Sequence, residues 1–181
     1  MKDTFQKTLN HPIYFEGLGL HSGINSKIKI LPAKSNQGIL FKRVDLTRNN
    51  TIKANYLNVS SAKLCTTLEN KDGVKVSTVE HLLAALYFAD IDNAIVEINA
   101  EEVPIMDGSA KNFLDILDKE EKQILPEKRK FLKVQNKIEL VDGERTISIE
   151  PSEETFEVEF QLNYSNQIIG KQKNNINFNK D

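Results

Sequence analysis

The sequence has one cysteine, no tryptophan and only three histidines among its 181 residues. The single cysteine, Cys65, cannot form a disulfide within the chain, and no charged leader followed by an apolar run opens the sequence. We therefore expect a protein of the reducing cytoplasm. The longest unbroken apolar run, 82–89, is far shorter than the roughly 20 residues that span a bilayer, so we expect no integral membrane segment.

The sequence also lacks an excess of charge of either sign. Lysine and arginine number 24 against 26 aspartate and glutamate residues, which gives a formal net charge of −2. No overall field would draw such a chain to nucleic acid or to an anionic membrane. A charged ligand would therefore have to be bound by a local site. The hydrophobic content of 39% is typical of a globular domain.

Short segments with alternating apolar and polar residues, separated by glycine, proline and asparagine, fill the first part of the chain. This pattern predicts half-buried antiparallel strands at 26–30 and 38–42. The turn at 70–73 predicts a hairpin of 64–68 with 74–76, leading directly into a helix. A further strand is expected at 94–98.

Two helices are predicted, at about 78–89 and 109–119. The spacing of Ser77 and Glu80 matches a capping box at the start of the first helix. Its expected buried face is formed by apolar residues at helical offsets, namely Val79, Leu82, Leu83, Leu86 and Tyr87. Asp107 or Ser109 is expected to cap the second helix.

The spacing of Ser22-Gly23, Pro32 and Phe41 returns as Asp142-Gly143, Pro151 and Phe160. We therefore expect an α+β fold made of a duplicated two-layer unit, an antiparallel-rich sheet plus two helices. Residues 1–125 would form a complete N-terminal domain, 126–130 a linker, and 131–181 only the first strands of the second unit.

The second copy would stop where a helix should begin, after Asn177. A sheet without its helices exposes an apolar face, so we expect 131–181 to be poorly ordered or prone to aggregate. That face would be drawn from Ile147, Ile149, Phe156, Val158, Phe160 and Leu162.

Glu80 and His81 share the first turn of the predicted first helix, where the helix dipole favours a carboxylate and a neutral imidazole. A neutral imidazole binds metals, and a glutamate beside a metal-bound water can take its proton. Two other interpretations stay open on the pattern alone. Glu80 could be only the capping-box partner of Ser77, and His81 only a core histidine bonded to a carbonyl group.

Three further positions also allow two interpretations each. Cys65 fits a small buried residue better than a nucleophile, since no neighbouring base is evident. His21, between Gly19 and Gly23, fits either an exposed turn or a loop whose backbone approaches a ligand. Asp107, in Pro104-Ile-Met-Asp-Gly-Ser109, fits either a helix cap or a site residue.

Several segments, in this order and spacing, resemble the UDP-3-O-acyl-N-acetylglucosamine deacetylase family, zinc enzymes of lipid A synthesis in Gram-negative bacteria. They are Gly17-Leu-Gly-Leu-His21-Ser-Gly, Phe41-Lys-Arg-Val-Asp45, Leu64-Cys65-Thr-Thr, Ser77-Thr-Val-Glu80-His81-Leu and Glu102-Val-Pro-Ile-Met-Asp107-Gly-Ser. The resemblance implies that Glu80 is the general base and His81 one Zn²⁺ ligand. It also implies that Leu64 and Cys65 line the site of the UDP-sugar substrate, and that His21 helps to hold its nucleotide or sugar end.

The resemblance also implies two similar α+β units with the active site between them. The second unit of the family supplies a His-Lys-x-x-Asp segment with the other two zinc ligands, and this chain contains no such segment. We therefore expect a C-terminally truncated and inactive deacetylase fragment. The alternatives are a non-catalytic half-protein that binds a partner, or one subunit of a split enzyme whose C-terminal half is separate.

Overall fold

The computed structural model describes residues 4–152 and 156–178. The chain divides into two compact units, Met1–Arg129 and Lys130–Asp181. The first unit contains two helices and several sheets, so the predicted mixed α+β class is confirmed. No helix in the described ranges combines the length and the apolar character needed to cross a bilayer.

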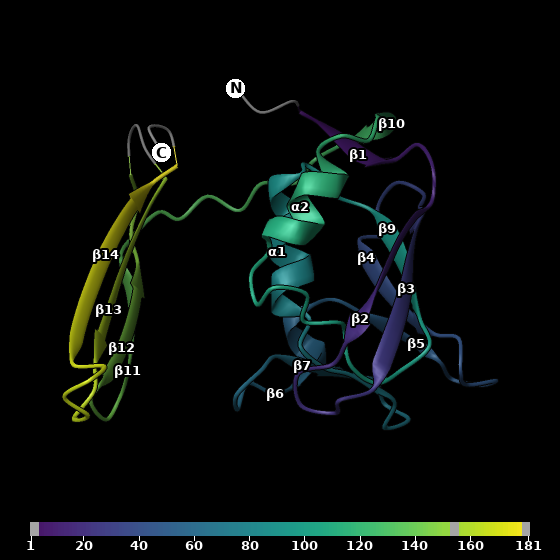
Figure 1. The fold of residues 1–181 in the computed structure, drawn as a ribbon. Coiled ribbons are helices and arrows are strands. Elements are labelled where there is room, and N and C mark those ends of the chain that lie inside the picture. The colour runs from purple at the N-terminus through teal and green to yellow at the C-terminus, as the bar shows by residue number, and fades with distance from the viewer. Residues whose placement is uncertain (1–3, 153–155, 179–181) are drawn as a thin grey trace. The chain divides into compact units, whose positions relative to one another are not determined.

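A five-stranded sheet forms one layer of the first unit, in the order β2-β3-β9-β4-β5 (Figure 1). β9 lies at its centre and pairs antiparallel with β3 and parallel with β4, while the other pairs are antiparallel. The strands predicted at 26–30, 38–42 and 94–98 are all confirmed. The bounds are β2 Ile13–Leu18, β3 Asn25–Pro32, β4 Ile39–Arg43, β5 Thr51–Lys53 and β9 Ala94–Ile98.

A smaller three-stranded sheet contains the predicted hairpin. It consists of β6 Val59–Ser61, β7 Thr67–Glu69 and β8 Lys75–Val76, and a short 3-10 helix, Tyr56–Asn58, precedes it. Residues 64–66, expected as part of the strand, lie outside β7. The physical reason is the left-handed backbone of Leu64, φ 69°, which an extended strand cannot contain.

A further strand pair joins the two ends of the first unit, where β1, Phe5–Leu9, pairs antiparallel with β10, Lys122–Lys128. The expected linker, 126–130, overlaps the end of β10. Pro126 has no N–H to donate, and it lies where the register of the pair shifts between Phe5 and Lys7. Proline and several charges therefore do not prevent strand pairing here.

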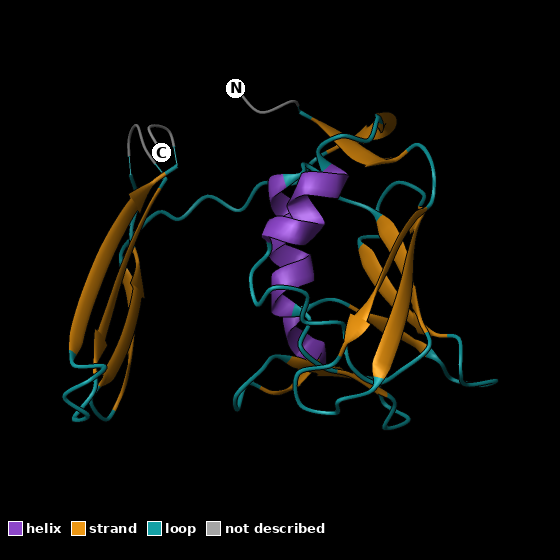
Figure 2. Ribbon diagram, viewed as in Figure 1, coloured by secondary structure: helices purple, strands orange, loops and turns teal. Residues whose placement is uncertain are grey.

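The two helices, α1 Glu80–Phe88 and α2 Lys111–Leu117, lie side by side against one face of the sheet (Figures 1 and 2). Both are confirmed, and both are shorter than predicted. The buried stripe of α1 is Leu82, Ala85 and Leu86. Tyr87 was wrongly assigned to this stripe and is 56% exposed, because it lies about 100° around the helix from Leu86 on the side away from Ala85.

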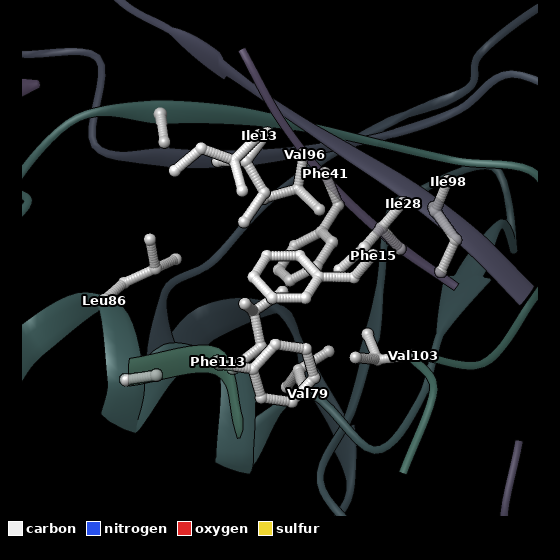
Figure 3. Packing of buried hydrophobic residues seen from close by; sticks show 14 of the residues in the cluster. Ile13, Phe15, Ile28, Phe41, Val79, Leu86, Val96, Ile98, Val103 and Phe113 are labelled. Carbon is white, nitrogen blue, oxygen red and sulfur yellow. The ribbon is translucent and has the colours of Figure 1, made fainter. Parts of the chain in front are cut away.

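Apolar side chains from the sheet and from both helices meet in one core (Figure 3). The ring of Phe113 in α2 meets Phe15 of β2 edge to face, with 5.0 Å between the ring centroids. Leu86 of α1 and Phe41 of β4 are almost fully buried in the same cluster. Burial of each such side chain stabilises the fold by roughly 1.5–3 kcal/mol, so α1 is held firmly against the sheet.

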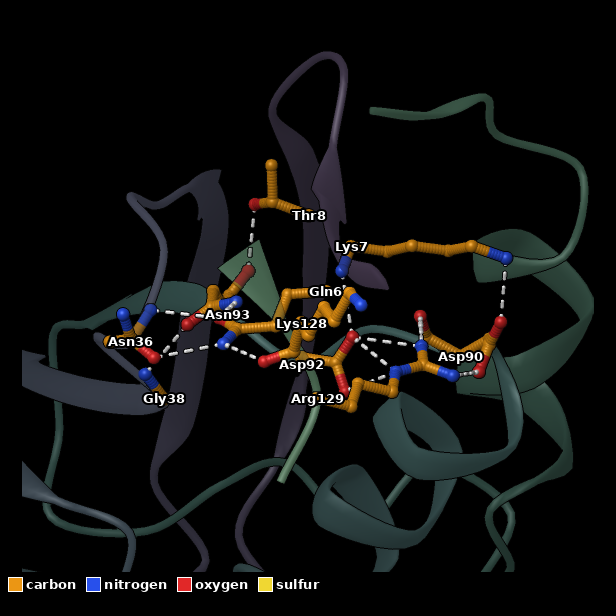
Figure 4. A network of polar contacts seen from close by, with 10 residues as sticks. All are labelled: Gln6, Lys7, Thr8, Asn36, Gly38, Asp90, Asp92, Asn93, Lys128 and Arg129. Carbon is orange, nitrogen blue, oxygen red and sulfur yellow. Dashed lines mark hydrogen bonds and ion pairs between the residues drawn. The ribbon is translucent and has the colours of Figure 1, made fainter. Parts of the chain in front are cut away.

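Asn93, just before β9, is a buried polar residue with hydrogen bonds to two other segments, β1 and the turn before β4 (Figure 4). Its Oδ1 accepts from the N–H of Gly38 at 2.9 Å, and its Nδ2 donates to Gln6 Oε1 at 2.9 Å. Thr8 Oγ1 donates to its backbone carbonyl at 2.7 Å. These bonds attach β1 to the sheet and satisfy polar groups that would otherwise be costly to bury.

Arg129, the last residue of the first unit, binds two aspartates in the turn after α1 (Figure 4). Its Nη2 lies 2.8 Å from Asp92 Oδ2, and its Nη1 lies 2.7 Å from Asp90 Oδ1. Lys7 Nζ also contacts Asp90 Oδ2 at 2.7 Å. The first unit is therefore closed by ion pairs at the C-terminal end of the helix that begins with Glu80.

In the second unit, strands are the only regular structure among the described residues (Figure 2). β11 Ile138–Asp142 pairs with β12 Arg145–Ile149, and β13 Glu157–Asn163 pairs with β14 Lys171–Asn177, both antiparallel. Asn177 ends β14, and residues 179–181, where a helix was expected to open, lie outside the described residues.

The apolar face predicted for the second unit is exposed in large part. Ile147 is 70% and Phe160 57% exposed, whereas Leu162 is partly covered. Poor order or aggregation of this segment stays a prediction. Both copies of the expected repeat run strand, turn and strand, with glycine of positive φ in the turn, but the fold does not by itself show a duplication.

Candidate functional site

The candidate site is built around the first turn of α1, where Glu80 and His81 are both half-buried. This turn lies beside the small β6–β8 sheet (Figure 1). Glu80 Oε2 accepts a hydrogen bond from the backbone N–H of Thr66 at 3.0 Å. The N–H of Val79 donates to the carbonyl of Thr66 at 3.4 Å, so the segment 64–66 is attached to the start of the helix.

The expected capping box between Ser77 and Glu80 was wrong. Val79 is the N-cap residue and makes no side-chain cap bond, and the Ser77 hydroxyl instead donates to the carbonyl of Glu101 at 3.2 Å. Ser77 forms a parallel bridge with Glu102, and its backbone bonds both Glu101 and Val103. This extended pairing keeps Ser77 out of the helix, and it leaves Glu80 available to Thr66.

Leu64 and Cys65 lie in the segment that Glu80 holds. The Leu64 side chain is 85% exposed, and Cys65 is half-buried with its Sγ 3.8 Å from Thr67 Oγ1. Since Thr66 bonds the Glu80 carboxylate directly, these two residues are next to the candidate base. Sequence reasoning placed them at the site, and the structure brings their segment to Glu80.

The His21 loop, residues 19–24, connects β2 to β3, and the His21 side chain is exposed. Its backbone is bound by Glu102, a residue that sequence reasoning assigned no role. The N–H of His21 lies 3.0 and 3.2 Å from the two carboxylate oxygens, and the N–H of Ser22 lies 2.8 Å from Oε2. On its other side Glu102 Oε1 accepts from Thr78 Oγ1 at 2.9 Å. One carboxylate thus joins the His21 loop to the residue two positions before Glu80.

Glu102 is ionised at ordinary pH although it is buried, with 3% of its surface exposed. Burial alone would raise its pKa. Hydrogen bonds from the backbone of His21, from Ser22 and from the Thr78 hydroxyl outweigh that effect and lower the pKa to about 2. The carboxylate is therefore a permanent acceptor for the loop and for Thr78.

Gly19 leaves room for this carboxylate. A Cβ atom at Gly19 would lie 2.5 Å from Glu102 Oε2 and 2.3 Å from Ser22 Oγ, closer than real Cβ contacts come. Gly17 has a similar role on a smaller scale, since a Cβ there would lie 3.2 Å from Pro104 Cβ. Both glycines are explained by close packing of the 17–22 segment on the 102–106 segment.

Three residues other than glycine have a left-handed backbone in the segments just described. They are Leu64 at φ 69°, Thr78 at φ 56° and Met106 at φ 55°. Such conformations cost about 1–3 kcal/mol each and persist where the surroundings enforce them, often at functional sites. Thr78 is the strongest case, because it is β-branched and its hydroxyl is bonded to the buried Glu102.

Asp107 is exposed and organises the turn before α2. Its Oδ1 accepts from the N–H and the hydroxyl of Ser109, at 3.0 and 2.9 Å, and these bonds lower its pKa. The Ser109 hydroxyl in turn accepts from the N–H of Lys111, the first residue of α2. The N-cap residue itself is Ala110 and makes no side-chain bond, so the cap predicted at Asp107 or Ser109 was displaced by one or more residues.

Within residues 4–152 and 156–178, no group of three His, Cys, Asp or Glu side chains is arranged to hold a metal ion. His81 supplies one imidazole and Glu80 one carboxylate, which is already bonded to Thr66. The described residues therefore fit part of a metal site and do not complete one.

Comparison with known proteins identifies what these segments are similar to. The family model of UDP-3-O-acyl N-acetylglycosamine deacetylase, LpxC, matches residues 6–181. A UDP-3-O-acyl-N-acetylglucosamine deacetylase of Geotalea uraniireducens is 39% identical over 177 residues, which are 98% of this chain and 57% of the relative. The protein of the same name from Phenylobacterium zucineum is 37% identical over 169 residues, 93% of this chain and again 57% of the relative. The chain thus spans little more than half the length of these curated relatives.

Proposed function

Since the chain belongs to the UDP-3-O-acyl N-acetylglycosamine deacetylase family, we propose that its first unit forms one side of an amide-hydrolysing site around Glu80 and His81. The proposed substrate is the UDP-3-O-acyl-N-acetylglucosamine of the relatives' names, deacetylated in the cytoplasm on the route to lipid A. The observation that carries the proposal is the Glu80 carboxylate in the first turn of α1, bonded to the segment of Leu64 and Cys65.

Glu80 is the proposed general base. The N-terminal end of α1 stabilises its negative charge, and the N–H of Thr66 fixes the direction of one carboxylate oxygen. A carboxylate held in this way can take a proton from a water molecule that attacks the amide carbon.

His81 is the proposed ligand of one Zn²⁺ ion. When bound, the ion would lower the pKa of its water toward neutrality and polarise the amide carbonyl. A catalytic zinc site takes three ligands from protein, so His81 alone would hold the ion weakly. We therefore propose that the remaining ligands come from outside the described residues, and that the 181-residue chain does not hydrolyse the substrate by itself.

Leu64, Cys65 and His21 are the proposed substrate contacts. The exposed Leu64 and the half-buried Cys65 offer an apolar surface next to Glu80. The exposed imidazole of His21 can donate a hydrogen bond to the nucleotide or sugar end.

The second unit would begin a copy of the first, which is supported by the positive φ of both Gly23 and Gly143 in the corresponding hairpin turns.

The experiment is an assay of acetate release from the acylated UDP-sugar with and without zinc. The 181-residue chain alone should release no acetate above the background. Mixed with the C-terminal part of the Geotalea relative that the match does not cover, it should release acetate only when zinc is present. Zinc-dependent release by the chain alone would contradict the proposal that it needs ligands from elsewhere.

A second candidate function is that of a non-catalytic half-protein that binds a partner chain. The specific observation in its favour is the exposed apolar surface of the second unit, which includes Ile147 and Phe160. Size-exclusion chromatography with that C-terminal part separates the two candidates. A stable complex that stays inactive with zinc supports a binding role, whereas an active complex supports a split enzyme.

A further inference from the structure

Glu102 is a buried charged residue to which the proposed function assigns no role. It is buried in the loop after β9, and it accepts hydrogen bonds from residues 81 and 80 positions earlier as well as from Thr78. These partners belong to the His21 loop and to the turn that opens α1. Both segments carry residues of the proposed site, whereas Glu102 itself is enclosed by them.

We propose that Glu102 is a positioning residue of the site, whose carboxylate fixes the His21 loop against the first turn of α1 and so sets the placement of His21 relative to Glu80 and His81. The importance of this placement rests on the proposed function. The placement itself does not, because it is a property of the first unit that can be measured without substrate.

The geometry supports a carboxylate specifically. The groups that hydrogen-bond this carboxylate act as donors: the backbone N–H groups of His21 and Ser22, the Ser22 side chain and the Thr78 hydroxyl. A glutamine would offer one oxygen and would turn an NH₂ group toward these donors, so at least one buried donor would lose its partner. An aspartate is one methylene shorter and could not reach both segments at once.

The backbone of Thr78 gives a second, independent support. Its left-handed conformation is costly for a β-branched residue, and Glu102 Oε1 accepts its hydroxyl at 2.9 Å. Release of this bond should let Thr78 relax, and since Val79 and Glu80 follow directly, the first turn of α1 should move with it. The carboxylate therefore influences the two catalytic candidates through the chain and not by contact.

The test uses the full 181-residue chain and two variants that disturb the same contact from opposite sides. Glu102→Gln removes the acceptor, and Gly19→Ala forces a Cβ atom to within 2.5 Å of where Oε2 now lies. The matched control is Glu101→Gln, since the neighbouring Glu101 side chain is 62% exposed and lies 3.8 Å from Arg43. NMR is used to follow amide hydrogen exchange and the imidazole resonances of His21 and His81.

Both variants should make the amides of His21 and Ser22 exchange at least about tenfold faster than in the parent chain. The imidazole resonances of His81 should shift in both variants, while amide protection in β9 is retained and Glu101→Gln changes none of these readings. The His81 resonances distinguish the two roles that Glu102 could have. If Glu102 only held the His21 loop in place, the His81 resonances would not shift.

Unchanged exchange at His21 and Ser22, or unchanged His81 resonances, would overturn the proposal. So would a uniform loss of protection that includes β9, because it would show that Glu102 supports the fold as a whole. If Glu102→Gln does not fold, Gly19→Ala provides the same measurement with the carboxylate present. A failure of the proposed function would appear in the acetate assay alone and would leave these spectra as predicted.

Discussion

The carboxylate of Glu80 and the backbone N–H of Thr66 are joined by a hydrogen bond of 3.0 Å between Oε2 and N. The bond links residues fourteen positions apart and attaches the Leu64-Cys65 segment to the start of α1. It is compatible with a base role, since it uses one oxygen of the carboxylate. Among the described residues, no hydrogen bond occupies Oε1.

The low pKa of Glu102 predicts a specific loss of stability in acid. Its folded-state pKa of about 2 lies below the ordinary value of 4.5, so its contribution is present above pH 4.5 and is lost as the pH falls through 2. The shift corresponds to roughly 3 kcal/mol. Urea unfolding of the parent chain between pH 5 and 2 should show this decrease in the unfolding free energy, and Glu102→Gln should show less of it. Parallel pH profiles of the two proteins would contradict the assigned pKa.

Phe113 should be one of the most sensitive core positions of the first unit. It is fully buried and meets Phe15 edge to face, so Phe113→Ala should lower the free energy of unfolding by about 3–5 kcal/mol. Phe88→Ala is the matched control on the neighbouring helix, where the ring is 46% exposed, and should cost less than half as much. Equal costs in urea unfolding would show that α2 is not packed on the sheet as described.

Arg129 should stabilise the first unit through its two aspartates. Arg129→Ala leaves Asp90 and Asp92 without this partner, and since the arginine side chain is 9% exposed, the loss should be about 2–4 kcal/mol. Lys111→Ala breaks an exposed ion pair with Asp115 on α2 and should change stability by less than about 1 kcal/mol. The comparison is again made by urea unfolding, and a small effect of both variants would contradict the buried ion-pair account.

The second unit should show weak protection against amide exchange. Its strands pair only in two separate hairpins among the described residues, and Phe160 and Ile147 are largely exposed. Hairpins of this kind are marginally stable in water by themselves. We expect fast exchange across 131–178 in the monomer and slower exchange once the C-terminal part of a relative is added. Strong protection throughout the segment in a monomer would contradict this expectation.

Local patterns in the sequence predicted the elements whose signals are local. The strand at 94–98 was predicted with the bounds that β9 has, and its sequence, Ala-Ile-Val-Glu-Ile, is rich in the β-branched residues that favour strands. The helix with Glu80 and His81 was also predicted, from apolar residues at helical spacing. Its start was not, because Ser77 bonds Glu101 and Val103, a pairing with residues more than twenty positions away.

Long-range partners explain the other differences. Lys122–Lys128 contains Pro126 and several charges, so the sequence predicts a linker at 126–130, and the pairing with β1 near the N-terminus is what makes this segment a strand. Glu102 was noticed only as part of a motif. Its role depends on residues 21, 22 and 78, which the fold places around its carboxylate. The only local signal was a glutamate directly before the buried Val103 and Pro104.

The central claim is that Glu80 is the base of a deacetylase site, and a chimera tests it most directly. This chain would replace the matching part of the Geotalea relative, which is 39% identical over 177 residues, and acetate release would be measured with zinc. Glu80→Gln should lower the rate by at least about 100-fold, as expected for loss of a general base. Glu69→Gln, a change of the same kind in β7, should leave the rate within about twofold, because the Glu69 carboxylate forms a partly exposed ion pair with the Lys75 ammonium at 3.5 Å and is assigned no part in the reaction. Equal rates for Glu80→Gln and the unmodified chimera would contradict the account.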